Sequence, residues 1–200
     1  VGYVEIAPPP GFNDLPAFLH ALAATLDAMH GATREPVNQS VRGGTQTAGL
    51  LFGRSDAVID AAQAALSNAV ETWLATMPVD PTHPFLSRRR REVRFAGSWS
   101  VKLRSSGHHS NHIHTKGWAS SAFYVALPGS VLASDATSCA GWIQFGQPLE
   151  SLGLDLPPRR LIQPRPGHLA LFPSYMWHGT VPFDDPESRL TIAFDVQPKN

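Results

Sequence analysis

The chain has 200 residues, which is enough to bury a hydrophobic core without disulfide or metal staples. Its 16 basic and 16 acidic side chains balance to a formal net charge of zero, which argues against a general attraction to nucleic acid or to anionic membranes. The 18 prolines and 16 glycines predict many turns and therefore a β-rich fold.

A single cysteine, Cys139, excludes a disulfide framework within the chain and favours a cytoplasmic location. No stretch of about 18 apolar residues occurs, so we expect no membrane-spanning helix. The arginine run 88–91 has no interleaved aromatic residues, which favours a solvated loop over a nucleic-acid site. The expected partner is a small-molecule or peptide substrate, and the sequence gives no indication of the oligomeric state.

The N-terminal part of the chain predicts two helices. Residues 1–12 contain a proline triplet and are expected to form an extension. Apolar residues at helical spacing then run from a possible cap at Asn13-Asp14 to Gly31, and a second such run extends from Ser55-Asp56 to Pro78. Because only residues 38–53, rich in Gly and Thr, suggest strand and loop, residues 13–90 are predicted to be mainly helical.

From residue 91 onward the pattern predicts antiparallel β-structure. Short apolar or alternating runs are separated by Gly, Pro and Ser. The runs are 93–104, 120–127, 141–145, 160–163, 168–172 and 189–196. Their spacing predicts a β-rich α+β fold: a jelly roll over residues 91–200 with two N-terminal buttressing helices, in a single domain spanning 1–200.

Four of the nine histidines fall in the stretch GHHSNHIHT, residues 107–115. If His112 and His114 lie on a strand, both imidazoles leave the same face and can chelate one metal ion, although a polar loop is an equally good interpretation of this pair. His178, at the end of a probable strand, is a third candidate ligand. Neutral imidazole suits Fe, Zn, Cu and Ni.

Arg189 opens the run RLTIAFDV, and Thr191 and Asp195 are expected to share its face. A guanidinium group presents a planar fork that binds a carboxylate through two hydrogen bonds, and a buried arginine needs such a partner. A surface arginine at the start of an edge strand is the alternative interpretation.

These motifs together resemble the Fe(II)- and 2-oxoglutarate-dependent dioxygenases, and more narrowly a bacterial group of such oxygenases, some of which are attached to tetratricopeptide repeats. The likeness lies in H-x-H, in the distal histidine of FPSYMWHG and in Arg-x-Thr, and it extends over roughly residues 38–196. It rests on the stretches 43–47, 98–103, 112–128 and 169–183. It implies a double-stranded β-helix and an enzyme that hydroxylates an unidentified substrate with release of succinate and CO2.

The resemblance also implies roles for individual residues. His112 and His178 would bind Fe(II), and Arg189 would bind the distal carboxylate of 2-oxoglutarate with help from Thr191. Tyr124 would offer a hydroxyl to the same cosubstrate. The catalytic set that follows contains His112, His114, His178 and Arg189.

The sequence departs from the family pattern where most members have a metal-binding carboxylate, because His114 occupies that position. Asp195 is six residues beyond Arg189, about 20 Å along a strand, and neither it nor the other nearby acids is placed like the missing ligand. Those other acids are Asp135, Asp184, Asp185 and Glu187. The prediction is therefore a three-histidine metal site of His112, His114 and His178, for which Zn(II) competes with Fe(II).

Two alternatives remain open at this stage. One is a cupin-like metal-binding protein or enzyme that uses Zn, Mn or Fe without 2-oxoglutarate, although residues 115–120 lack the glutamate usual in cupins. The other is a non-catalytic binding domain whose helices form a partner surface. His108 and His109 are expected to line the mouth of the site or to face solvent.

Overall fold

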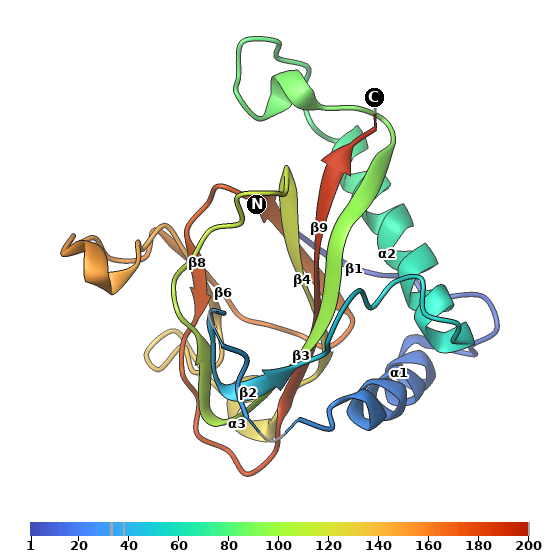
Figure 1. Ribbon diagram of the computed structural model, residues 1–200, viewed down its shortest axis with the longest axis vertical. Helices are drawn as coiled ribbons and strands as arrows, with labels where there is room; N and C mark the ends of the chain where they lie inside the picture. The colour runs from blue at the N-terminus through green and yellow to red at the C-terminus, as the bar shows by residue number, and fades with distance from the viewer. Residues whose placement is uncertain (33, 38, 200) are drawn as a thin grey trace.

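The protein is described by a computed structural model that covers residues 1–32, 34–37 and 39–199. Two antiparallel sheets face each other, and helices α1 and α2 cover the outer side of the larger one (Figure 1). The larger sheet has the strand order β1-β7-β4-β9-β3-β2, and the smaller has the order β6-β5-β8. The predicted jelly roll with two buttressing helices is confirmed.

The strands and helices have the following bounds. The larger sheet contains β1 (Gly2–Glu5), β2 (Val41–Gln46), β3 (Val93–His109), β4 (Ala119–Ala126), β7 (His168–Pro173) and β9 (Arg189–Pro198). The smaller sheet contains β5 (Ile143–Phe145), β6 (Arg160–Ile162) and β8 (His178–Thr180). The helices are α1 (Leu15–Met29), α2 (Ala57–Ala75) and α3 (Gly129–Leu132), with 3-10 turns η1 (Leu86–Arg88) and η2 (Glu150–Leu152).

Both long helices begin at the predicted caps. The Asp14 carboxylate accepts a hydrogen bond from the backbone N–H of Ala17 at 2.8 Å, and Asp56 accepts from the N–H groups of Val58 and Ile59 at 2.9 and 3.1 Å. These bonds satisfy N–H groups that have no partner within the helix. The two helix predictions are therefore confirmed.

The main hydrophobic core lies between these helices and the larger sheet. Each helix presents one apolar stripe, and β9 contributes every second side chain. Fully buried members of this core include Leu22, Leu26, Ile59, Leu66, Val70, Phe123 and Ile192. The opposite side of the sheet is thereby left free to face the smaller sheet.

The N-terminal residues differ from the expectation of an extension. Residues 2–5 form β1, which pairs antiparallel with β7 at the edge of the larger sheet. The proline triplet follows this strand and so removes no hydrogen bond from it. Each of the six runs predicted as β-structure contains a strand, and β2 falls within the range 38–53, of which Asn38 lies outside the described residues. That the chain is a single domain remains a prediction.

Among the residues that the structure describes, no helix combines the length and the apolar character needed to cross a bilayer.

Candidate active site

A cavity of about 750 Å³ lies between the two sheets. Small side chains of the larger sheet, Ala122 and Ala193, line it on one side, and Ile143 of β5 lines it on the other. His112, His114 and His178 also line this cavity, as do Arg189, Thr191 and Asp195. A volume of this size accommodates a small molecule together with a cofactor.

The segment that carries His112 and His114 is a loop, which is one of the two interpretations that the sequence left open. Strand β3 ends at His109, and beyond it His112 forms only an isolated antiparallel bridge with His178. The two residues exchange backbone hydrogen bonds of 2.9 and 3.0 Å, and the N–H of His114 donates to the carbonyl of Ser174 at 2.9 Å. These bonds hold the loop extended, so His112 and His114 still line the same cavity.

Gly179 makes this close approach possible. A Cβ atom at this position would lie 2.3 Å from Oδ1 of Asn111 and 2.9 Å from the carbonyl oxygen of His109, both of which are too close for van der Waals contact. The Asn111 side chain in turn accepts a hydrogen bond from Nε2 of Gln144 at 2.8 Å. The glycine after His178 therefore lets the histidine loop pack directly onto β8.

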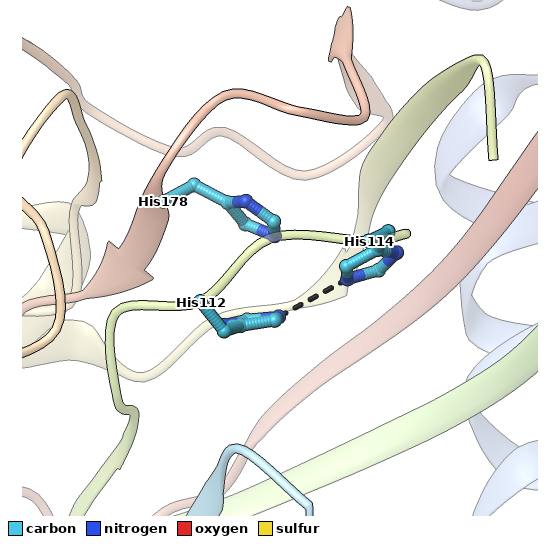
Figure 2. Close-up of side chains that lie close together, drawn as sticks. All are labelled: His112, His114 and His178. Atoms are coloured by element: carbon cyan, nitrogen blue, oxygen red, sulfur yellow. Dashed lines mark hydrogen bonds between the residues drawn. The ribbon is translucent and has the colours of Figure 1, made fainter. Parts of the chain in front are cut away.

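The three imidazoles converge on one point (Figure 2). One ligand nitrogen of each ring lies within 4.8 Å of the other two, and Nε2 of His112 is 3.1 Å from Nε2 of His114. Two ligands at right angles around a metal, each at a bond length of about 2.1 Å, are separated by about 3 Å. The spacing between His112 and His114 therefore fits adjacent positions on a single metal ion.

Hydrogen bonds at the far side of each ring fix which nitrogen faces this point. Nδ1 of His112 donates to the carbonyl of Ser110 at 2.8 Å, and Nδ1 of His178 donates to the carbonyl of Met176 at 3.0 Å. Nδ1 of His114 lies 2.6 Å from Oδ1 of Asp195. With Nδ1 protonated in all three rings, each Nε2 keeps its lone pair for a metal.

Burial favours the neutral form of His112 and His178. Desolvation, followed by the nearby His114 ring, lowers the pKa of His112 to about 4. Desolvation and then the His112 ring also hold the pKa of His178 well below its usual value. Neutral imidazoles at physiological pH can bind a metal without first losing a proton.

Arg189 occupies the same cavity as the histidines. Only 2% of its surface is exposed, and among the described residues it forms no ion pair, while its Nε atom has no hydrogen-bond partner. Its Cζ lies 5.2 Å from the centre of the Tyr124 ring. Burial lowers the pKa of Arg189, yet a guanidinium stays charged at neutral pH. A buried and unpaired cation of this kind is a site for an anion.

Tyr124 and Thr191 lie beside this guanidinium. They are opposite each other in the register of β4 and β9, and both are buried. The Tyr124 hydroxyl is buried next to the guanidinium without a well-formed hydrogen bond among the described residues. Burial raises its pKa to about 12 although the nearby Arg189 acts in the opposite direction, so the hydroxyl remains protonated and able to donate. The structure thus brings together Arg189, Thr191 and Tyr124, the three residues to which the resemblance gave a part in cosubstrate binding, and that role remains a prediction.

The contact between Asp195 and His114 is the feature of the site that the sequence did not reveal. It shares the cavity face of β9 with Arg189 and Thr191, as predicted, but its carboxylate contacts the far nitrogen of His114 and so supports a candidate ligand. A signal for such a role was present, since an acid on the inner face of a buried strand must be paired. The partner was hidden because it comes from a loop 81 residues away in sequence.

The remaining two histidines of the stretch, His108 and His109, differ in their position relative to the cavity. His109 lines the cavity and its Nδ1 lies 3.1 Å from the hydroxyl of Ser40, whereas His108 is not among the residues lining the cavity. Burial lowers the pKa of His109 well below its usual value. The exposed side chains of Arg42 and Lys116 lie at the mouth, together with Gln39 and the half-buried Trp99.

Comparison with known proteins decides the family. Residues 97–195 match the sequence model of a family described as "Putative 2OG-Fe(II) oxygenase". The chain belongs to the 2-oxoglutarate- and Fe(II)-dependent oxygenases. The matched region contains the three histidines and Arg189, the residues from which the resemblance was first drawn. No curated protein sequence is significantly similar to the chain.

Solved structures of this oxygenase family share the fold over most of their length. A prolyl-4-hydroxylase from Pseudomonas putida is 14% identical, with a TM-score of 0.58 over 100% of this chain and 94% of the other. HygX from Streptomyces hygroscopicus, with nickel and 2-oxoglutarate bound, is 12% identical, with a TM-score of 0.59 over 99% and 83%. The viral collagen prolyl hydroxylase of Paramecium Bursaria Chlorella virus-1, in a 2-oxoglutarate complex, is 12% identical, with a TM-score of 0.57 over 98% and 96%. These likenesses establish the fold.

Proposed function

We propose that this oxygenase binds Fe(II) through His112, His114 and His178 and binds 2-oxoglutarate with Arg189. One observation carries the proposal: a buried, unpaired guanidinium shares a cavity with three imidazoles that converge through their Nε2 atoms. The two groups suit the two halves of the cofactor set, since imidazole binds iron and a guanidinium binds carboxylate.

The iron and cosubstrate would supply the oxidising chemistry, in which 2-oxoglutarate and O2 yield succinate and CO2 while a substrate is hydroxylated. The chain's own contribution is to bind and orient. Arg189 would bind the distal carboxylate, and the Tyr124 and Thr191 hydroxyl groups would add hydrogen bonds to it. The small side chains Ala122 and Ala193 leave room for the body of the cosubstrate.

The substrate would enter from the mouth formed by Gln39, Arg42, Trp99 and Lys116. A small molecule or a peptide side chain fits the space available. The indole of Trp99 has its centre 5.7 Å from that of the His114 ring, so a substrate that contacts Trp99 would also lie next to the metal ligands.

The cupin-like alternative gives no role to Arg189, whereas the present proposal requires it. A non-catalytic domain does not require three imidazole nitrogens within 4.8 Å of one another. No observation in the described residues favours either alternative over an oxygenase.

The proposal can be tested with protein purified anaerobically and supplied with Fe(II), 2-oxoglutarate and then O2. We expect succinate to form, slowly without substrate and faster with the correct member of a substrate library. His178→Ala should bind Fe(II) at least about 100-fold more weakly and form no succinate above background, because two imidazoles remain. His20→Ala, which removes an exposed imidazole on α1, is the matched control and should behave as wild type.

Absence of both succinate formation and 2-oxoglutarate binding in the iron-loaded wild-type protein would contradict the proposal. Equal activity of His178→Ala and wild type would contradict the ligand assignment while leaving the family unchanged.

A further inference from the structure

We propose that Asp195 is a positioning residue that holds His114 in place and supplies, through that imidazole, the negative charge that a metal-binding carboxylate would have provided. The inference rests on the proposed function, because it assumes that His114 is a ligand. It concerns a residue that lies one imidazole ring away from the metal position.

The three histidines are not supported in the same way. His112 and His178 each donate from Nδ1 to a neutral backbone carbonyl, at 2.8 and 3.0 Å. His114 alone donates to a carboxylate, and its contact of 2.6 Å is the shortest of the three. Short contacts of this kind are typical of charge-assisted hydrogen bonds. The charged support therefore belongs to the histidine that stands where the family pattern has an acid.

Asp195 is itself held rigidly. The Ser120 hydroxyl donates to the same carboxylate oxygen at 2.6 Å, and Ser120 and Asp195 are opposite each other in the β4–β9 register. The Ser174 hydroxyl oxygen lies 2.8 Å from that of Ser120. A Cβ atom at position 117 would come within 2.4 Å of the Ser174 hydroxyl and 3.1 Å of Asp195, so Gly117 lets the histidine loop close over this group.

The Asp195 carboxylate is buried without a lysine or arginine partner among the described residues. Only 8% of Asp195 is exposed, and among the described residues its sole ion-pair partner within 4.0 Å is His114. No lysine or arginine of the described residues lies within 4.0 Å to balance it, although a buried charge is costly when it is unpaired. A cation on Nε2 of His114 would draw electron density from the ring and make its Nδ1–H a stronger donor. The buried carboxylate is therefore compensated when His114 carries a metal.

The consequence concerns metal affinity. Three neutral imidazoles leave the full positive charge on a divalent ion, and Asp195 returns one negative charge at the distance of a single ring. Carboxylates that accept a hydrogen bond from a metal-binding histidine raise its basicity, and their removal typically weakens metal binding by about 10- to 100-fold.

Asp195→Asn is the decisive variant, because it keeps the shape of the side chain and a carbonyl oxygen that can accept from His114. With Co(II) as the probe and a competing chelator, we expect its Kd to rise about 10- to 100-fold relative to wild type. We also expect the visible Co(II) absorption bands to shift, because the ligand field of His114 weakens. Asp155→Asn, in an exposed loop, changes the net charge equally and should leave Kd and spectrum unchanged.

Ser120→Ala provides a second variant if Asp195→Asn does not fold, since it keeps the charge and removes one hydrogen bond to the carboxylate. Its Kd for Co(II) should rise, but less than that of Asp195→Asn. Urea unfolding of each metal-free variant separates a loss of fold from a loss of affinity.

The outcomes distinguish this inference from the function on which it rests. Wild-type protein that binds no Co(II) would overturn the proposed function. Wild-type binding that His178→Ala abolishes, together with an Asp195→Asn Kd within about twofold of wild type, would overturn only the role of Asp195. The charge contribution would also be overturned if Asp195→Ala lost affinity while Asp195→Asn kept both the affinity and the spectrum of wild type.

Discussion

The two faces of strand β9 do different work. Leu190, Ile192, Phe194 and Val196 point toward α1 and α2 and belong to the main hydrophobic core. The alternate residues Arg189, Thr191, Ala193 and Asp195 line the cavity between the sheets. Because successive side chains of a strand leave opposite faces, one ten-residue segment carries both core packing and site chemistry.

The two faces contribute to the free energy of folding with opposite sign. Burial of apolar side chains on the helix-covered face stabilises the fold, by about 1.5–3 kcal/mol for each large side chain. On the cavity face, a guanidinium without an ion-pair partner and a carboxylate whose one ion-pair partner among the described residues is an imidazole are held away from water, which opposes folding. The packed face thus holds in place a site whose polar groups would be satisfied by the proposed metal and cosubstrate. Substitutions on the cavity face should therefore lower ligand affinity without lowering stability, and substitutions on the helix-covered face should lower stability without lowering ligand affinity.

The largest expected effect follows from Arg189→Met. We expect binding of 2-oxoglutarate to weaken by about 4 kcal/mol, roughly 1000-fold in Kd, because the variant loses the one buried cation that lines the cavity in the described part of the chain. Metal affinity should persist, and the metal-free variant should unfold at the same or a higher urea concentration, since replacing an unpaired buried charge with an apolar side chain is neutral or favourable. Anaerobic 2-oxoglutarate titration and urea unfolding measure the two quantities.

Arg160→Met is the control for that variant, because Arg160 is exposed on β6 and outside the cavity lining. A cosubstrate Kd for Arg189→Met that equals the wild-type value would show that the guanidinium does not bind 2-oxoglutarate.

For Ile192→Ala, on the helix-covered face of the same strand, we expect a loss of stability without a loss of ligand affinity. Ile192 is fully buried, and removing its side-chain atoms should lower the free energy of unfolding by about 3 kcal/mol through lost burial and a residual cavity. The Kd values for metal and 2-oxoglutarate should stay near wild type for the protein that remains folded. Leu132→Ala, at a leucine that is 47% exposed, should change stability by less than about 0.5 kcal/mol. A large loss of cosubstrate affinity in Ile192→Ala would break the separation between the two faces.

A smaller effect should appear as a pH dependence of the metal-free protein. The pKa of His112 is about 4 in the folded chain, because of burial and the His114 ring, against about 6.5 in an unfolded chain. The folded state therefore binds fewer protons, so its stability is complete above pH 6.5 and falls as the pH drops toward 4. At pH 5 this group alone should cost roughly 1–2 kcal/mol.

Burial lowers the pKa of His178 in the same direction and adds to this loss. Urea unfolding in the presence of a chelator at pH 7.5 and pH 5 would measure the effect, which His112→Ala should reduce and His20→Ala should retain. Equal stability at the two pH values would indicate that these imidazoles are not held neutral by burial.

Much of the fold follows from local sequence signals. Asp14 and Asp56 precede apolar residues at helical spacing, and both cap the predicted helices because these signals act within one turn. The alternation in RLTIAFDV likewise predicts β9 with Arg189, Thr191 and Asp195 on one face. In contrast, β1 lies in residues expected to be an extension, since pairing with β7 places together segments that are far apart in sequence.

The sequence by itself therefore determined the classes of side chain that meet: three imidazoles, a guanidinium and the hydroxyl groups beside it. Residue type and strand periodicity are local, and they suffice to choose the chemistry. Only the tertiary structure decided that His112 and His114 lie on a loop held by backbone bonds to His178 and Ser174, and that Asp195 supports His114. Those contacts join segments some 60 to 80 residues apart, and no local pattern specifies which loop folds back over which strand.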